Sequence, residues 1–289
     1  MIKDLIKLYR IPQWIKNLFV FVPLIFSKHL FDSGYLFTTT IAFLIFCFTS
    51  TIVYIINDIV DADSDKLHPK KKNRPIAAGR ISESKALNVA LGFFVLLLLL
   101  LRGFNIQFIS AIAAYLILNV FYTFYFKNIV LLDVFSIAAG FMLRVIAGAF
   151  AINVEISSWL ILTTMFISLF LAVMKRRSEL NLTENDGVNY TRKVLEFYSK
   201  DFTDQMATVA AAGVIVCYAL YTVASRTITI FGTEKLIYTT PFVVFGIFRY
   251  MYLVYMNKKG ENTTEILITD PAMIINMAFY ILITTLIIY

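Results

Sequence analysis

The chain is poor in charged residues. Asp, Glu, Lys and Arg make up only 16% of its 289 residues, whereas a soluble domain has about 25%. Both cysteines, Cys47 and Cys217, fall in apolar runs, so no disulfide framework is indicated. The N-terminal sequence MIKDLIKLYRIPQWIKN has no small-residue cleavage site, so we expect no cleaved signal peptide. A low-complexity linker is also missing, and we expect a single domain over residues 1–289.

Apolar residues dominate the chain instead. They make up 59% of it, and the mean hydropathy is +0.76. Long runs such as VALGFFVLLLLLL predict helices that cross the roughly 30 Å hydrocarbon core of a bilayer, because a segment in lipid must satisfy its own backbone hydrogen bonds. We therefore expect an all-α polytopic membrane protein with nine transmembrane helices, at about 17–30, 35–56, 86–103, 106–126, 129–151, 157–174, 205–225, 237–256 and 270–288.

The distribution of basic residues predicts the orientation. With the N-terminus in the cytoplasm, 20 of the 26 Lys and Arg residues fall on the cytoplasmic side and only four outside. This split follows the positive-inside rule, and it accounts for the net charge of +7 without nucleic-acid binding. It places two polar loops, about 57–85 and 175–204, on the cytoplasmic face of the inner membrane.

The first polar loop contains a run of aspartates, in the stretch NDIVDADSDKLHPKKKNRPIAAG at 57–79. Asp58, Asp61 and Asp65 have the spacing i, i+3, i+7, which puts them on one face of a helix, whereas Asp63 points toward another face. Three carboxylates on one stripe repel each other unless a cation neutralises them, and oxygen ligands suit Mg²⁺. A solvated acidic helix end, or a capping aspartate, is the alternative interpretation.

A basic cluster follows the aspartates. Two prolines, Pro69 and Pro75, fix an extended turn. The basic residues lie between them, and they are Lys70, Lys71, Lys72 and Arg74. Carboxylates for a metal together with cations for phosphate oxygens are the groups that hold a diphosphate. Positive-inside topology alone is the alternative explanation for the cations.

The pattern N-D-x-x-D-x-x-x-D followed by R-P resembles the first aspartate motif of the UbiA superfamily of membrane prenyltransferases. The resemblance runs along nearly the whole chain. It implies a bundle of nine helices with the active site on the cytoplasmic side. It also implies that Asp58, Asp61 and Asp65 are catalytic residues that bind Mg²⁺ and, through it, a diphosphate.

The second polar loop departs from that superfamily's usual pattern, which has further acids there. This chain reads MKRRSELNLTEND, with Lys175, Arg176 and Arg177 in place of acids and Glu179 as the nearest carboxylate. Such a set favours a metal-free phosphate site over a second Mg²⁺–diphosphate site. Cations favoured at a helix end by the dipole and by topology are the alternative.

Charged residues also fall within the expected spans. Asp133 and Arg144 lie eleven residues apart on nearly the same face of the fifth span, Lys127 comes just before them, and Arg249 lies in the eighth. Charges inside a membrane are costly and usually face a cavity or a partner. A structural salt bridge between helices is the alternative for each.

Several motifs together resemble the branch of the superfamily that transfers phosphoribose from phosphoribosyl diphosphate to a polyprenyl phosphate of the decaprenyl type. They are the aspartate stretch at 57–79 and the shorter motifs RIPQWIKN, YTFYFKNIVLLD, GFMLRVIAG, KRRSEL and TTEILITDP. The resemblance implies this reaction, Mg²⁺ as cofactor, and membrane-embedded lipid as acceptor; a homo-oligomer is compatible with it. Asp133 joins the three aspartates as a candidate catalytic residue. The candidate substrate-binding residues are Lys16, Asn57, Lys71, Arg74, Tyr122, Lys127, Arg144, Lys175, Arg176, Arg177 and Glu179.

Three other functions fit parts of the sequence. A prenyltransferase that moves a prenyl group from prenyl diphosphate to an aromatic or other acceptor would need an acid-rich second loop. A transporter would line its path with the intramembrane charges, yet here most charges gather in loops at one face. A lipid-binding module without catalysis has no need of three aligned aspartates.

Overall fold

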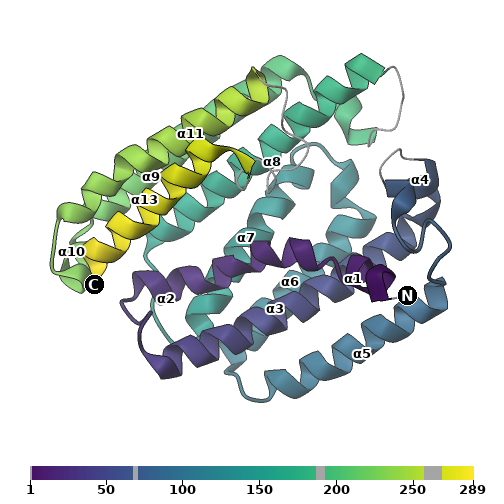
Figure 1. Cartoon of the computed structure of the whole chain (residues 1–289), viewed down its shortest axis with the longest axis horizontal. Coiled ribbons are helices and arrows are strands. Elements are labelled where there is room, and N and C mark those ends of the chain that lie inside the picture. Colours follow the sequence, from purple (N-terminus) through teal and green to yellow (C-terminus); the bar gives the residue numbers. More distant parts are fainter. Residues whose placement is uncertain (1, 68–70, 187–192, 257–268) are drawn as a thin grey trace. The chain divides into compact units, whose positions relative to one another are not determined.

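The computed structural model describes residues 2–67, 71–186, 193–256 and 269–289, and in these ranges the chain is helical, with connecting turns and no strand (Figure 1). The chain divides into two compact units. The first comprises Met1–Lys127 and Leu143–Glu155, and the second Asn128–Met142 and Ile156–Tyr289. Helix α7 (Leu132–Ala151) therefore gives its first half to the second unit and its second half to the first.

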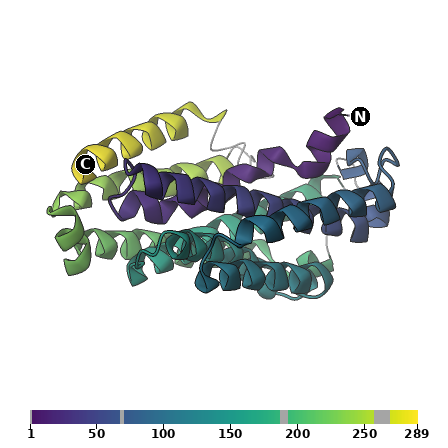
Figure 2. The same cartoon turned by 90° about the horizontal axis from the view of Figure 1, so that it is seen from below.

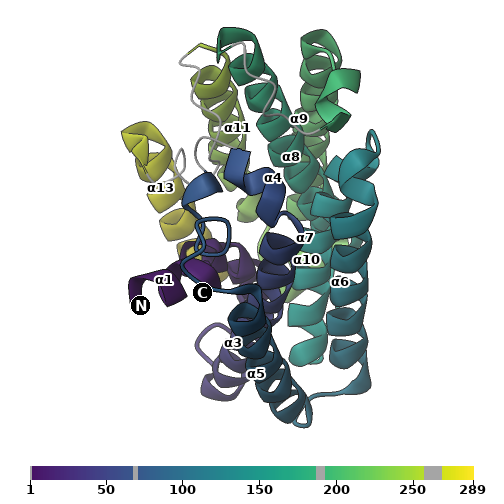
Figure 3. The ribbon, with the colours of Figure 1, turned by 90° about the vertical axis from the view of Figure 1, so that its right-hand side faces the viewer.

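The first unit begins with α1 (Ile2–Tyr9), the 3-10 helix η1 (Ile11–Phe21) and α2 (Val22–Phe26). Two long helices, α3 (Ser33–Val60) and α5 (Glu83–Leu101), then lie side by side (Figures 1 and 3), linked by α4 (Ala62–Leu67) and η2 (Lys71–Asn73). Helix α6 (Ile106–Phe124) and η3 (Phe126–Asn128) follow. Side-chain caps at Asp32, Ser82 and Asn105 start α3, α5 and α6 by accepting hydrogen bonds from backbone N–H groups.

The second unit is built on α8 (Ser158–Asp186) and α9 (Lys200–Val223), which pack along each other, with η4 (Lys193–Phe197) before α9. After α10 (Ser225–Phe231) and η5 (Lys235–Thr239) come α11 (Thr240–Tyr255) and α13 (Pro271–Ile288), which pack against each other (Figure 2). The core of this unit includes Phe170, Met174, Val214 and Tyr250.

Eight helices of the described residues are long and apolar enough to cross a membrane. This confirms an all-helical, multi-pass membrane protein, but it does not confirm nine spans. The expected first span, 17–30, consists of the end of η1 and the five-residue helix α2. Pro23 interrupts this stretch at the start of α2, and Pro12 lies before it at the start of η1; a proline cannot donate a backbone hydrogen bond.

Helix α8 also extends further than the sequence predicted. It continues to Asp186, so the first part of the expected loop 175–204 is helical. Side chains one turn apart stabilise this extension, because Arg176 pairs with Glu179 and Arg177 donates to Asn181 at 2.6 Å.

A close approach of η1 to α7 depends on Gly148. A Cβ at this position would lie 2.2 Å from the backbone oxygen of Val20. We expect Gly148→Ala to destabilise the protein by about 1–3 kcal/mol, because overpacking forces the backbone apart. The matched control is Gly92→Ala, since a Cβ at Gly92 meets nothing within 4 Å. Thermal unfolding of both variants in detergent tests this, and an unchanged midpoint for Gly148→Ala would contradict the close packing.

Candidate functional site

The aspartate run lies where α3 ends and α4 begins. The helical hydrogen bonds continue across this junction, from Asp61 N to Asn57 O at 2.9 Å and from Asp65 N to Asp61 O at 2.8 Å. Asp58 and Asp65 therefore face the same side, and both accept hydrogen bonds from Nη1 of Arg74, at 3.1 and 2.5 Å. The structure thus brings together the acids and the arginine that the sequence pattern selected.

The fourth aspartate of the run points elsewhere, as its spacing predicted. Asp63 is 97% exposed and bonds only to Lys66 among the described residues, at 2.7 Å, whereas the Asp58 side chain is 2% exposed. The ammonium group of Lys66 lowers the pKa of the Asp63 carboxyl. A substitution of Asp63 is therefore a suitable control for substitutions of the three aligned aspartates.

Each of the three aligned carboxylates is paired with a cation. Arg10 donates to Oδ1 of Asp58, Arg74 bridges two of the aspartates, and Nζ of Lys127 lies 2.6 Å from Oδ1 of Asp61. Three acids and three cations make the cluster neutral as a whole. Sequence reasoning missed Arg10, which counted only as a cytoplasmic charge, because nothing in its local pattern links it to a residue 48 positions away.

The cluster has the donor chemistry that Mg²⁺ requires. Its ligating atoms are oxygens, and Oδ1 of Asn57 is buried without a hydrogen-bond partner among the described residues. Within that same part of the chain, no three His, Cys, Asp or Glu side chains are gathered as a ready metal cage. Each of the three aligned carboxylates is instead engaged by a cation, and two of them share Nη1 of Arg74.

A second polar cluster of the first unit surrounds Arg144, which is buried. Its Nε donates to Oδ1 of Asn17 and its Nη2 to the hydroxyl of Tyr115, both at 2.8 Å. Nearby Lys16 is half-buried, and desolvation together with the charges of Arg144 and Arg10 lowers its pKa to about 8. Mutual repulsion of these cations favours a bound anion.

In the second unit, Asp133 is held by a buried network. Nε of Arg176 lies 2.7 Å from its Oδ2, the hydroxyl of Tyr198 donates to its Oδ1 at 2.7 Å, and Arg176 also pairs with Glu179. The side chains of Asp133 and Arg176 are 0% and 1% exposed. Burial and the bond to Asp133 raise the pKa of Tyr198. For Asp133, the structure thus shows the interhelical salt bridge that the sequence left as an alternative.

Two more arginines of the second unit join helices. Nε of Arg177 bonds Oδ1 of Asp204 on α9 at 2.7 Å, and its guanidinium lies 5.7 Å from the ring centre of Tyr255 on α11. Arg249 of α11 bonds both carboxylate oxygens of Asp270, at 3.1 and 2.8 Å, at the start of α13. These contacts connect α8 to α9 and α11, and α11 to α13, within the second unit.

Three further candidate residues are half-buried: Lys71 on η2, Tyr122 on α6 and Lys175 on α8. Pro69 and Lys70 of the first loop lie outside the described residues, as does most of the motif TTEILITDP.

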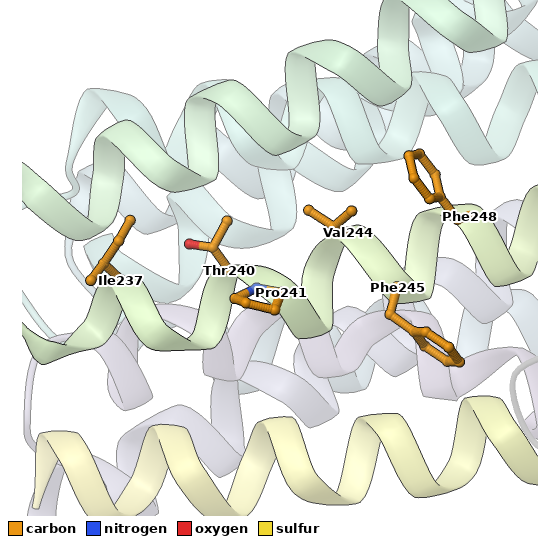
Figure 4. Close-up of a pocket in the computed structure, with 6 residues that line it drawn as sticks. All are labelled: Ile237, Thr240, Pro241, Val244, Phe245 and Phe248. Carbon is orange, nitrogen blue, oxygen red and sulfur yellow. The ribbon is translucent and has the colours of Figure 1, made fainter.

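A groove of about 650 Å³ runs along η5 and α11 in the second unit (Figure 4). It is lined by Ile237, Thr240, Pro241, Val244, Phe245 and Phe248. Four of these follow one another at helical spacing (237, 240, 244 and 248), and their side chains point to the same side in the figure. Since it contains no ionisable side chain, the groove suits an apolar chain rather than a phosphate.

Comparison with known proteins identifies relatives over most of the chain. The profile of the UbiA prenyltransferase family matches residues 18–269. A decaprenyl-phosphate phosphoribosyltransferase of Mycolicibacterium smegmatis is 35% identical over 225 residues, which is 76% of this chain and 70% of that protein. The protein of the same name from Corynebacterium glutamicum is 35% identical over 221 residues, 75% of this chain and 66% of the relative.

Solved structures show the same fold. A UbiA homolog from Archaeoglobus fulgidus bound to DMAPP and Mg²⁺ superimposes with a TM-score of 0.71 at 19% identity, covering 98% of both chains. The homolog bound to GPP and Mg²⁺ gives a TM-score of 0.70 at 18% identity, covering 99% of this chain and 96% of that one.

Proposed function

Because the chain belongs to the UbiA prenyltransferase family, we propose that it is the transferase that moves 5-phosphoribose from phosphoribosyl diphosphate to a polyprenyl phosphate of the decaprenyl type, with release of diphosphate. The observation that carries this is the pairing of three aligned aspartates with Arg10, Arg74 and Lys127. Such a set supplies ligands for a metal and cations for a diphosphate. The names of the relatives favour a sugar diphosphate as the donor.

In this proposal the donor diphosphate binds at the aspartates. Asp58, Asp61 and Asp65 hold Mg²⁺, with the amide oxygen of Asn57 as a further ligand. When bound, the metal neutralises the leaving diphosphate as a Lewis acid. The ion pairs of Arg74 and Lys127 with the aspartates then break. Both side chains donate hydrogen bonds to phosphate oxygens instead, which guanidinium and ammonium groups bind strongly.

The transfer itself needs positioning more than proton transfer. Cleavage at C1 of the ribose develops oxocarbenium character, as in glycosyl transfer generally. The acceptor phosphate is already anionic at neutral pH, so its oxygen attacks C1 without a dedicated base, and inversion gives a β-linked product. Orientation and electrostatic stabilisation by the cations then supply most of the rate.

The remaining cations are the candidates for the other phosphate groups. Lys16 and Arg144 lie together in the first unit, and Lys175 and Arg177 lie on α8 of the second, where Arg177 pairs with Asp204. Arg176 is buried and pairs with both Asp133 and Glu179, and we assign it and Asp133 to positioning α7 and α8. We further propose that the protein lies in the cytoplasmic membrane with its N-terminus and active site on the cytoplasmic side.

A reconstituted assay tests the function. Purified protein is incubated with Mg²⁺, radiolabelled phosphoribosyl diphosphate and a polyprenyl phosphate. We expect label to move into the organic phase only when metal and lipid phosphate are both present. Failure of this transfer together with prenylation of a small acceptor from prenyl diphosphate would instead establish the prenyltransferase reaction.

The low pKa of Lys16 predicts a pH dependence. The ammonium form binds a phosphate and the neutral form does not, so kcat/KM should fall as the pH rises through about 8. An arginine stays charged throughout this pH range, so Lys16→Arg should make kcat/KM nearly independent of pH. A profile of kcat/KM against pH from 6.5 to 9.5 checks this. An identical fall in the variant would assign the titration to another group.

A further inference from the structure

We propose that Arg10 couples the binding of Mg²⁺ to that of the diphosphate: it restrains Asp58 when no diphosphate is bound and transfers to the phosphate oxygens when one arrives. This inference rests on the proposed function, because it concerns the same aspartate site. It adds the N-terminal segment to that site and gives this segment a role in the order of binding.

The structure fixes the N-terminal segment on one face of α3. The contacts are made by Thr51, Tyr54 and Asp58, whose spacing i, i+3, i+7 puts them on one face of α3. The hydroxyl of Thr51 donates to the carbonyl oxygen of Tyr9 at 3.2 Å. The guanidinium of Arg10 lies 4.9 Å from the ring centre of Tyr54 and donates to Asp58. The segment therefore brings its arginine to the aspartate site in a defined position.

The backbone of Arg10 is strained. Its φ of 51° and ψ of 42° are left-handed, between α1 and η1. A left-handed conformation costs a residue other than glycine about 1–2 kcal/mol. Such strain persists only where surrounding contacts impose it, and it gathers at functional sites. Here the Arg10 side chain contacts Tyr54 and Asp58, and the preceding residue, Tyr9, accepts a hydrogen bond from Thr51.

Two contacts anchor the segment independently of Arg10. Leu8 is fully buried in a cluster with Ile55 and Ile76. Nε of Arg80 bonds Oδ1 of Asp4 at 2.8 Å, and Nη2 of the same arginine donates to the carbonyl oxygen of Asn73, next to Arg74, at 2.6 Å. Because α1 stays in place without it, the pair with Asp58 is free to exchange.

Charge balance gives the reason for exchange. Asp58 accepts hydrogen bonds from two guanidinium groups, those of Arg10 and Arg74, and Arg74 also pairs with Asp65. A Mg²⁺ ion bound at these carboxylates repels both arginines, so binding of the metal alone is opposed. A diphosphate reverses this, because it offers the displaced arginines stronger, charge-assisted hydrogen bonds. Metal and diphosphate should therefore each tighten the binding of the other to the same extent.

Calorimetry on the purified full-length protein tests the coupling, with Mg²⁺ titrated in the absence and presence of inorganic pyrophosphate. For the unmodified protein we expect pyrophosphate to tighten Mg²⁺ binding by more than about tenfold, within the range typical of coupled sites. For Arg10→Ala we expect tighter binding of Mg²⁺ alone and a coupling reduced severalfold. The control is Lys7→Ala, which removes an exposed cation from the same segment and should leave the coupling unchanged.

Two outcomes would overturn the inference: an unchanged coupling in Arg10→Ala, or the same loss in Lys7→Ala. If Arg10→Ala fails to fold, Arg10→Lys decides, since an ammonium retains the charge but lacks the guanidinium fork, and partial coupling is expected. The proposed function is tested separately. Coupled binding of Mg²⁺ and pyrophosphate without phosphoribosyl transfer would refute the proposed reaction and leave the role of Arg10 standing.

Discussion

Asp61→Asn is expected to lower phosphoribosyl transfer roughly a thousandfold, because metal neutralisation of the leaving group is worth several kcal/mol in the transition state. Asp61 is the most suitable of the three aspartates for this test. Its side chain is 26% exposed and bonds only to Lys127 among the described residues, so an amide at this position leaves no buried arginine without its counter-ion. The measurement is the initial rate of label transfer at saturating Mg²⁺.

The matched control for this variant is Asp63→Asn. It removes the same charge two residues away, from a side chain that faces solvent and pairs only with Lys66 among the described residues. Its rate and thermal midpoint should both stay close to those of the unmodified protein, since exposed ion pairs contribute little. Full Mg²⁺-dependent activity in Asp61→Asn would rule out its assignment as a metal ligand.

The second large effect is expected on stability. Asp133→Asn leaves the buried guanidinium of Arg176 without its main counter-ion, and breaking a buried pair costs about 3–5 kcal/mol. The amide also disturbs the bond from the Tyr198 hydroxyl, which ties the chain before α9 to α7. We therefore expect a marked fall in the thermal midpoint in detergent, together with a loss of activity that follows the loss of folded protein.

Asp201→Asn is the reference for that measurement. Asp201 is exposed in the first turn of α9, where a carboxylate contributes at most about 1 kcal/mol through the helix dipole. Its midpoint should change little. If Asp133→Asn instead keeps the midpoint of the unmodified protein but loses activity, Asp133 acts in the chemistry rather than in positioning.

Much of the candidate site could be read from the sequence because its residues are close in the chain. Asp58, Asp61 and Asp65 lie within two helical turns, and helical geometry alone puts them on one face and turns Asp63 away from it. Arg74 follows within a short turn, so its proximity to the acids was also predictable. The membrane class was equally accessible, since apolar composition and segment length determine it.

The interrupted first segment shows where such reasoning ends. Hydropathy treated 17–30 as a span, but Asn17 within it is buried and donates to Ser50 at 3.1 Å. A buried amide needs partners, and only the neighbouring helix supplies them. The count of spans thus depends on contacts that a hydropathy window does not contain.

The sequence by itself determined the membrane class, the helical elements and the aligned aspartates, because these follow from composition and from periodicity within one segment. Only the tertiary structure decided which charge meets which. It pairs Asp58 with Arg10, and it pairs Asp133 with Arg176 rather than with Arg144. These partners are separated by 48 and 43 residues. Coulombic attraction acts between any two opposite charges and grows as they approach, so the packing of the helices that carry them decides which two become partners.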